Sequence, residues 1–448
     1  MGKLFGTDGI RGVANEYPMI PEMAEKIGRA IAYLFGRGKS HTKIVVGRDT
    51  RISGNMLEDA LALGICAMGG DAYLTGPLPT PGVAYLTDNM GFDAGVVISA
   101  SHNPFPDNGI KFFERDGFKL PDETELQIER LVLGHNHMPD GSAGEAGKKR
   151  VISDACSHYV EFLKDAVSRE GNLGGLNAVL DCSNGATFQA APATFSALGA
   201  SVHTLFAEPD GQNINLNCGS EYPQTLAETV VGEKADVGFA FDGDGDRVTA
   251  VDETGTILTG GQILAICAKH LKEGGRLANN VVVSTVMSNL GLGLALETLG
   301  VDLVTTPVGD KHVLREMLAK GACIGGEDSG HMIFLEYHKT GDGILTALML
   351  VRAMKKAGRP LSELARIMKV FPQCLVNVEV KEKKLIGDVP AIVTVIKDVE
   401  ETLGAGGRVL VRYSGTQPLC RIMVEGPTDQ ETKASCEKIA DVVRNELG

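Results

Sequence analysis

One pattern of apolar and polar positions occurs three times along the chain. Each copy has an apolar strand, a short polar loop, a helix, a stop of small residues and a second strand, and the copies begin at Lys43 (KIVVGRDTRISG), Asn177 (NAVLDCSNGATF) and Asn280 (NVVVSTVMSN). Strands that alternate with helices at this spacing predict βαβ crossovers, and hence mostly parallel sheets that are covered on both faces. The repeat therefore predicts three related mixed α/β domains.

The pattern changes after residue 370. Strands are expected over 375–380, 408–412 and 421–425, and helices over 390–403 and 430–447. This order predicts a smaller C-terminal two-layer α+β domain. Glycine-rich or polar joints at 134–150, at 251–259 and near Val370 divide the chain into four predicted domains, namely 1–150 with the run SASHNP, 151–254 with FDGDGDR, 255–369 with GEDSGH and 370–448 with RYSGT.

Composition excludes several classes of protein. The 448 residues carry a formal net charge of −14, and no basic stripe is present that would bind nucleic acid. No apolar run approaches the ~20 residues of a membrane span, and the first residues lack the apolar core of a signal peptide. Nine cysteines form no C-x-x-C pair, which indicates a reducing compartment and predicts a cytoplasmic protein.

The run FDGDGDR, residues 241–247, carries the strongest chemical signal. Asp242, Asp244 and Asp246 alternate with glycines, and three carboxylates in a tightly curved loop form an oxygen cage for a hard divalent cation. The spacing also resembles an EF-hand, but Arg247 stands where that loop needs glycine, and the flanks are β-like rather than helical. The alternative is a solvated acidic turn, which the mutual repulsion of the carboxylates disfavours. We therefore expect one Mg²⁺ per chain.

The run SASHNP, residues 99–104, follows a buried strand, where ligands of α/β domains usually bind. In isolation, a capping or hydroxyl turn explains Ser101 better than catalysis does. A hydrolase nucleophile would need a G-x-S-x-G elbow, which the sequence lacks, and His102 as an immediate neighbour is expected to be poorly placed to deprotonate Ser101. A phosphoserine is the other interpretation, because its phosphate would give oxygens to the metal bound by the three aspartates.

Further polar loops have residue types that suit sugars and phosphates. GEDSGH, residues 326–331, offers a carboxylate and a hydroxyl for sugar hydroxyls, although a helix-capping turn explains it equally well. RYSGT, residues 412–416, together with Arg421 forms a candidate phosphate cradle, with an ordinary hairpin as the alternative. The loops 6–12 and 47–51 are glycine-flanked and carry arginines, and each can equally be a turn with a solvated cation.

The four motifs SASHNP, DGDGDR, GEDSGH and RYSGT, in this order, resemble the signature loops of the α-D-phosphohexomutases along nearly the whole chain. The resemblance implies that Ser101 carries the phosphate and that Ser101, Asp242, Asp244 and Asp246 hold the metal. It further implies catalytic roles for Ser101, His102, Lys111, Arg11 and Arg247, sugar binding by Glu327, Ser329, His331 and Asp310, and phosphate binding by Arg412, Ser414, Gly415, Thr416 and Arg421. The proton carrier stays open among Lys111, His102, Asp310 and His331. Gln417 departs from the family's glutamate.

Such enzymes transfer the serine phosphate to a sugar monophosphate and take the other phosphate back from the resulting bisphosphate. A glucose- or glucosamine-bisphosphate would prime the serine. Segments that begin at Gly76, Ile98 and Gly325 resemble the branch that converts glucosamine 6-phosphate to glucosamine 1-phosphate, with a phosphomannomutase/phosphoglucomutase as the alternative. A non-catalytic phosphosugar or calcium sensor is the rival outside catalysis. The expected partner is a small phosphosugar, and the sequence leaves a homodimer open.

Overall fold

Each of the three predicted repeats forms a β-α-β unit in the structure. Their first and second strands are neighbours in one sheet, and the pairs β2/β3 and β7/β8 are parallel. The units are β2 (Lys43–Arg48), α2 (Gly54–Ala67) and β3 (Asp71–Pro77); β7 (Asn177–Asp181), α6 (Thr187–Ala197) and β8 (Ser201–Leu205); and β11 (Val281–Thr285), α9 (Leu290–Thr298) and β12 (Asp302–Thr306).

The computed structural model describes residues 4–6, 8–37, 39, 41–139, 141, 145–168, 171–414 and 418–448. The chain divides into two compact units, one of residues 1–286 and 304–366 and one of residues 287–303 and 367–448. Helix α9 of the third repeat thus groups with the C-terminal domain. The four predicted domain ranges stay predictions. Among the described residues, no helix has the length and apolar character that a membrane crossing requires.

The first sheet has six strands in the order β1-β5-β4-β2-β3-β6. Ile44 and Val46 of β2 pack into a core with α1, α2 and α4, whereas Val45 is equally buried on the opposite face, where α3 contacts β2 and β4. Both faces of the sheet are therefore covered, as the βαβ pattern predicts. The remaining elements are β1 (Ile10–Val13), α1 (Pro21–Phe35), α3 (Thr80–Asn89), β4 (Ala94–Ile98), β5 (Asp107–Glu114), α4 (Asp122–Val132) and β6 (Lys149–Val151).

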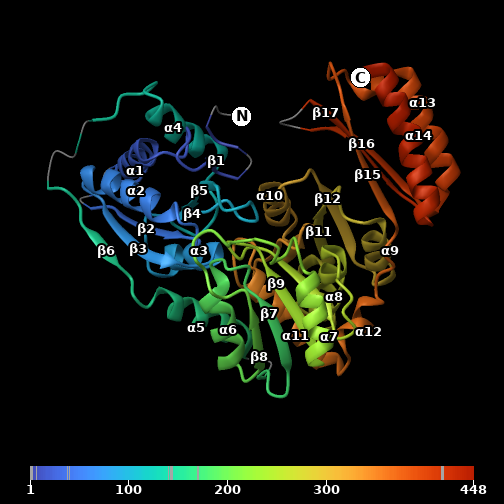
Figure 1. Ribbon diagram of the computed structural model, residues 1–448, viewed down its shortest axis with the longest axis horizontal. Coiled ribbons are helices and arrows are strands. Elements are labelled where there is room, and N and C mark those ends of the chain that lie inside the picture. Colours follow the sequence, from blue (N-terminus) through green and yellow to red (C-terminus); the bar gives the residue numbers. More distant parts are fainter. Residues whose placement is uncertain are drawn as a thin grey trace. The chain divides into compact units, whose positions relative to one another are not determined.

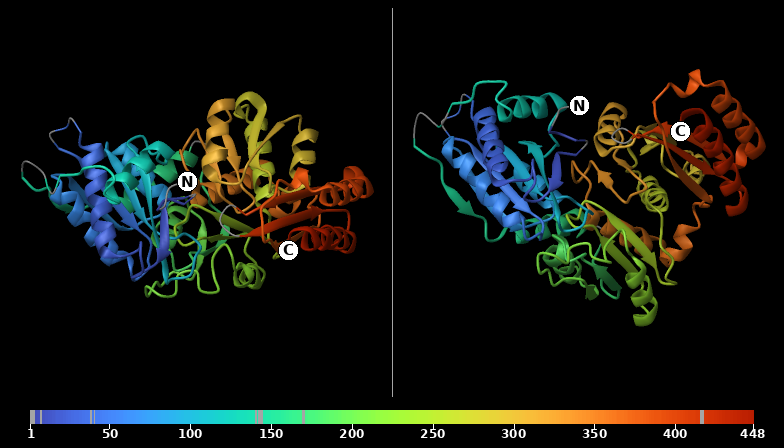
Figure 2. Two further views of the ribbon diagram at one scale, coloured as in Figure 1. Left: turned by 90° about the horizontal axis from the view of Figure 1, so that it is seen from above. Right: turned by 45° about the horizontal axis from the view of Figure 1, so that its top comes forward.

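Helices α1 and α2 lie side by side along this sheet (Figure 2) and cross at two glycines. A Cβ on Gly28 would lie 2.2 Å from the carbonyl oxygen of Leu61, and a Cβ on Gly64 would lie 2.0 Å from that of Glu25. Gly28→Ala must therefore push the two helices apart, and we expect it to destabilise the protein by about 2 to 3 kcal/mol. Denaturant unfolding of the variant and the wild type measures this difference.

The matched control is Gly232→Ala, because Gly232 also lies within a helix, α7 (Gln224–Glu233), and a Cβ added there would have no atom within 4 Å. Alanine favours helix over glycine, so this control should change stability by no more than about 1 kcal/mol, in the stabilising direction. Equal destabilisation by the two substitutions would contradict the close helix crossing.

The second and third sheets have four strands each, in the orders β10-β9-β7-β8 and β12-β11-β13-β14. The outer strands β10 and β14 are antiparallel to β9 and β13, so each pair is joined by a loop at the carboxyl edge of the sheet. These two loops contain the acidic and the GEDSGH motifs. The remaining elements are α5 (Ala155–Ser168), α7, β9 (Val237–Phe241), β10 (Val248–Asp252), α8 (Gly260–Glu273), α10 (Asp310–Lys320), β13 (Ile324–Gly326), β14 (Met332–Phe334), α11 (Gly343–Ala357) and α12 (Leu361–Ala365).

Local side chains set the starts of several helices. Thr259 forms a capping box with Gln262 at α8, and the Asp342 carboxylate accepts a hydrogen bond from the Leu345 amide at α11. Thr428 accepts from the Glu431 amide at the start of the last helix. These side chains satisfy amide groups that would otherwise lack partners in the first turn.

The C-terminal domain is an antiparallel sheet in the order β15-β17-β16, against which two helices pack (Figure 1). Its elements are β15 (Gln373–Glu379), α13 (Pro390–Leu403), β16 (Arg408–Tyr413), β17 (Leu419–Glu425) and α14 (Asp429–Leu447). The predicted order and bounds agree with these elements to within a few residues. The predicted fold class, three α/β domains followed by a two-layer α+β domain, is therefore confirmed.

Candidate active site

The acidic loop connects the antiparallel strands β9 and β10. Asp242 and Asp244 are fully buried, Asp246 is 3% exposed, and one carboxylate oxygen from each lies within 4.8 Å of the others. Gly245 adopts a φ of +73°, which gives the loop its tight curvature at a position where a side chain would be strained. The three carboxylates thus converge in the interior, as the sequence predicts.

The donor set fits a hard divalent cation. Within the described part of the chain, neither Asp244 Oδ1 nor Asp246 Oδ1 has a hydrogen-bond partner, although both atoms are buried. Buried carboxylate oxygens without partners are costly unless a cation compensates them. Burial and the repulsion of Asp246 and Asp244 also raise the pKa of Asp242 well above its usual value. A metal ion bound by the three carboxylates would remove both penalties.

Ser101 lies beside this loop, although 141 residues separate it from Asp242 in sequence. It follows β4, and its hydroxyl donates a 2.5 Å hydrogen bond to Asp242 Oδ2. Its φ of +54° is unusual for a residue with a side chain. A metal held by the aspartates would therefore lie within reach of a phosphate on Ser101, as the phosphoserine hypothesis requires.

The expectation that His102 is poorly placed relative to Ser101 is wrong. His102 Nδ1 lies 3.3 Å from Ser101 Oγ, within hydrogen-bond distance. Burial and the nearby Arg247 guanidinium lower the pKa of His102. The neutral imidazole is therefore favoured, and it can accept a proton at a ring nitrogen.

Lys111 links the first domain to the acidic loop. It lies on β5, is 2% exposed, and its Nζ lies 2.7 Å from Asp244, 3.1 Å from Asp8 and 3.5 Å from Asp246. Burial alone would lower the pKa of Lys111, but the carboxylates, Asp244 foremost, raise it well above its usual value. The carboxylates around Lys111 thus favour its charged form.

Asp310 and His331 continue the network on the third domain. His331 Nδ1 lies 3.7 Å from Asp246 Oδ2, and its Nε2 lies 3.6 Å from Asp310 Oδ2. Burial would lower the pKa of His331, but Asp246 and Asp310 raise it. Lys119 forms an ion pair with Asp310 and another, at 2.6 Å, with Asp8. Side chains from three domains thus form one continuous chain of charges.

The two predicted arginines lie at the edge of this network. The Arg247 amide donates to Asp242 Oδ1 at 3.1 Å, and its guanidinium Nε lies 3.9 Å from Asp246 Oδ1. Arg11 Nη2 donates to Asp8 Oδ2 at 2.9 Å. Arg11 is therefore joined to Lys111 through a shared carboxylate.

The predicted sugar-binding loop lies between β13 and β14. The Glu327 carboxylate accepts a hydrogen bond from the Gly309 amide at 3.0 Å. Burial would lower the pKa of Arg247, but the charges of the acidic loop and of Glu327 raise it. Ser329 is exposed at the tip of the loop. The structure thus brings Glu327 close to Arg247 and leaves the Ser329 hydroxyl open to solvent.

The predicted phosphate cradle belongs to the second unit. Arg412 and Arg421 are directly opposite each other on β16 and β17, and burial and the charge of Arg421 lower the pKa of Arg412. Ser414 is buried, and its carbonyl oxygen accepts from Lys383 at 2.7 Å. Two guanidinium groups held side by side favour an anion between them. Gly415, Thr416 and Gln417 lie outside the described residues.

Sequence reasoning missed several members of the site. Asp8 lies in the glycine-flanked loop 6–12, in which only Arg11 was given a role, and Lys119 follows an ordinary turn without a motif. Thr80 lies at the start of α3. Its hydroxyl donates a hydrogen bond to Asp244 Oδ2 at 2.5 Å, and its backbone amide donates one to the Asp244 carbonyl oxygen at 2.8 Å. Only the carboxylate of Asp8, within a Gly-Thr-Asp-Gly run, offered a signal that could have been used.

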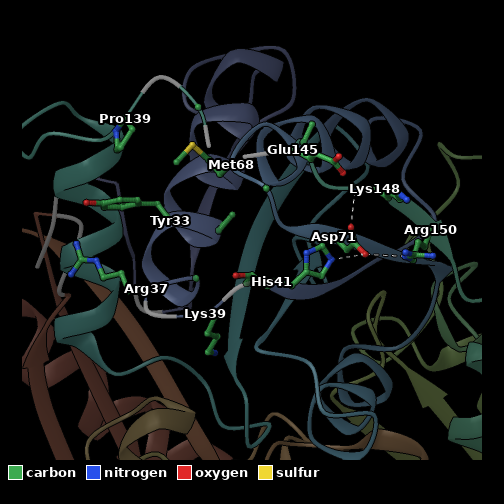
Figure 3. A pocket seen from close by; sticks show the side chains of 16 residues that line it. Tyr33, Arg37, Lys39, His41, Met68, Asp71, Pro139, Glu145, Lys148 and Arg150 are labelled. Carbon is green, nitrogen blue, oxygen red and sulfur yellow. Dashed lines mark hydrogen bonds and ion pairs between the residues drawn. The ribbon is translucent and has the colours of Figure 1, made fainter. Parts of the chain in front are cut away.

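A separate cavity of about 600 Å³ opens beside α1 and β3 (Figure 3). The buried Asp71 carboxylate forms ion pairs at 3.0 Å with both His41 and Arg150. Although burial raises the pKa of Asp71, these partners and the Lys148 amide lower it to about 2. No described residue that lines this cavity belongs to the predicted site, so the cavity lies outside the candidate active site.

The fold, with its three α/β domains and C-terminal α+β domain, and the buried serine-aspartate site are typical of one class of enzymes, the phosphosugar mutases. The chain belongs to the phosphoglucomutase/phosphomannomutase family, whose alpha/beta/alpha domains I, II and III match residues 2–137, 157–255 and 259–371, and whose C-terminal domain matches residues 375–442. Within that family, its relatives include a phosphoglucosamine mutase of Syntrophus aciditrophicus, 61% identical, and one of Syntrophobacter fumaroxidans, 53% identical, each matched over 100% of both chains.

Solved structures agree on the fold. A phosphoglucomutase/phosphomannomutase family protein from Burkholderia thailandensis matches with a TM-score of 0.81 and 23% identity over 99% of this chain and 98% of its own. An N-acetylphosphoglucosamine mutase from Aspergillus fumigatus matches with a TM-score of 0.72 and 18% identity over 100% and 96%. The predictions of the family and of a phosphosugar mutase, an isomerase, are confirmed.

Proposed function

We propose that this mutase interconverts glucosamine 6-phosphate and glucosamine 1-phosphate through a phosphoserine at Ser101 and a bisphosphate intermediate. The observation that carries the proposal is the 2.5 Å contact of the Ser101 hydroxyl with Asp242, within the cluster of three buried carboxylates. Support for the amino sugar comes from the relatives named phosphoglucosamine mutase, which match over the full length. A glucose- or glucosamine-bisphosphate would first phosphorylate the serine.

We propose Mg²⁺ as the metal, held by Asp242, Asp244, Asp246 and one oxygen of the Ser101 phosphate. Three carboxylates and a phosphate oxygen leave positions for water, which suits the octahedral preference of Mg²⁺. Bound there, the ion would neutralise charge on the transferring phosphoryl group.

The protein's own residues then position the phosphate and the sugar. Lys111 and Arg247 add positive charge beside the acidic loop, which favours the charge that develops on the phosphoryl oxygens. His102, whose Nδ1 lies 3.3 Å from Ser101 Oγ, is proposed to accept the proton of the Ser101 hydroxyl when the serine takes a phosphate back from the bisphosphate. Glu327, Ser329, His331 and Asp310 are proposed to orient the sugar ring by hydrogen bonds to its hydroxyls.

Arg412, Ser414, Gly415, Thr416 and Arg421 are proposed to bind the phosphate that does not react. Arg421→Ala should therefore raise KM about tenfold or more and change kcat little, because an interaction made equally in ground and transition states affects binding alone. Steady-state kinetics with glucosamine 6-phosphate measure the split. Arg444→Ala, on the exposed face of α14, is the control and should leave both constants unchanged; a loss confined to kcat would contradict the cradle.

Relative kcat/KM for the 6-phosphates of glucosamine, glucose and mannose, measured with primed enzyme and Mg²⁺, tests the proposed substrate. Glucosamine 6-phosphate should be preferred. A preference for glucose or mannose phosphate would assign the chain to the other branch of the family. Binding of a phosphosugar without turnover, in phosphorylated and metal-loaded protein, would identify a sensor.

We also propose a cytoplasmic location. All nine cysteines are free thiols in the structure, as expected in a reducing compartment. Fractionation of cells that express the tagged chain tests this, and recovery from an oxidising compartment would refute it.

A further inference from the structure

Arg51 lies in the loop 47–51 and is fully buried, with 0% exposure. Its guanidinium faces the turn that carries Ser101. The group pairs with the Asp49 carboxylate at 2.8 Å and donates to four carbonyl oxygens of that turn, those of Ser101 (2.9 Å), Asn103 (2.7 Å), Pro104 (2.5 Å) and Asp107 (3.0 Å). One side chain therefore holds the whole turn between β4 and β5.

A second path leads from the same guanidinium to the amide of Ser101. The Asp49 carboxylate that pairs with Arg51 also accepts the Ser99 hydroxyl at 2.6 Å. The Ser99 hydroxyl in turn accepts the Ser101 amide at 2.9 Å. Both backbone polar groups of Ser101, its amide and its carbonyl, are thus tied to one buried ion pair.

The second domain adds another contact to this turn. Asn215 donates its side-chain amide to the carbonyl oxygens of Ser101, at 2.9 Å, and Asn103, at 3.0 Å. These are two of the four carbonyls that Arg51 also binds. The turn is therefore fixed from its own domain and from the domain that carries the acidic loop.

Such support has a physical reason. Ser101 has a φ of +54°, a conformation that residues with side chains rarely adopt and that persists only where the surroundings determine it. This backbone directs the hydroxyl to Asp242. Without the buried hydrogen bonds, the turn would relax toward ordinary dihedral angles and would carry the hydroxyl away from the acidic loop.

We propose that Arg51 is a positioning residue for phosphoryl transfer, which holds Ser101 in its strained conformation so that the hydroxyl faces the three aspartates. The inference rests on the proposed phosphoserine function. Arg51 touches neither sugar nor metal in this proposal, so its loss acts on the transfer step rather than on substrate binding.

The test is Arg51→Lys, which keeps the charge but cannot reach four carbonyls. Because misplacement of a reacting group by about 1 Å costs about a hundredfold in rate, we expect kcat to fall about a hundredfold with KM within about twofold. The matched control is Arg48→Lys at the end of β2. The Arg48 guanidinium donates to the backbone carbonyl oxygen of Asp49 and pairs with Glu58, and it contacts none of the four carbonyls, so kcat should be unchanged. An unchanged kcat in a folded Arg51→Lys variant would overturn the inference.

Asn215→Ala tests the same turn without removing a buried charge. It should lower kcat about tenfold at unchanged KM. Hydrogen exchange should show faster exchange of the non-proline amides of residues 101–108 both in this variant and in Arg51→Lys. If Arg51→Lys does not fold, the Asn215→Ala variant tests the inference by itself. A wild-type kcat together with wild-type hydrogen exchange in Asn215→Ala would then overturn the inference. If the wild-type protein forms no phosphoserine and does not turn over substrate, the proposed function itself is refuted. If the wild type is active and both Arg51→Lys and Asn215→Ala keep its kcat, only the role of Arg51 is refuted.

Discussion

Ser101→Ala is expected to abolish turnover of glucosamine 6-phosphate, with kcat lower by about four orders of magnitude or more. The substitution removes the oxygen that would carry the phosphate, and no other hydroxyl among the described residues donates to Asp242. Intact-mass measurement should find one phosphate on the wild-type protein after incubation with a sugar bisphosphate, and none on the variant. The same samples give both results.

Ser53→Ala is the matched control for this experiment. Ser53 is a partly buried serine of the same domain, and its hydroxyl accepts from Asn108 rather than facing the acidic loop. It should keep both the added phosphate and the turnover. A Ser101→Ala protein that still turns over, or a phosphate that remains after this substitution, would place the nucleophile elsewhere.

Asp244→Asn is expected to lower kcat/KM about a hundredfold to a thousandfold and to raise the Mg²⁺ concentration needed for half-maximal rate. An amide has no negative charge to give to the metal, and the substitution also removes the 2.7 Å ion pair with Lys111. Titration of activity against Mg²⁺, after removal of divalent ions with a chelator, measures the shift.

Asp252→Asn is the control for the metal effect. Asp252 is a buried aspartate of the same domain, at the end of β10, and its carboxylate accepts the amides of Thr254 and Thr256 in a turn. This variant should lose some stability and keep the wild-type dependence on Mg²⁺. An Asp244→Asn enzyme with normal activity at limiting Mg²⁺ would rule out the proposed cage.

The elements of the fold were predictable because local patterns specify them. The elements β2, α2 and β3 of the first repeat follow from apolar runs and from stops of small residues between them. The C-terminal helix predicted over 430–447 differs from α14 by one residue. The grouping of α9 with the C-terminal domain was not predictable. Which surface a helix packs on depends on contacts with distant residues, which the periodicity of a segment does not encode.

The residues of the candidate site likewise fall into those that the sequence predicts and those that only the structure reveals. The aspartates 242, 244 and 246 were predicted because their spacing itself carries the chemistry. Lys119 and Arg51 were given no role, because a lone lysine after a turn and an arginine in a short loop have many uses. Their importance arises from partners more than 45 residues away, such as Asp310 for Lys119 and the carbonyl of Ser101 for Arg51.

The amino-acid sequence by itself determined the repeated βαβ units, the acidic loop, the motif around Ser101 and the family to which they point, because residues close in sequence make each of these. Only the tertiary structure decided that Ser101 Oγ lies against Asp242, that His102 turns toward Ser101, and that Arg51 and Asn215 hold this strained turn. The physical reason is that burial, charge pairing and backbone strain depend on which distant segments meet in the folded chain.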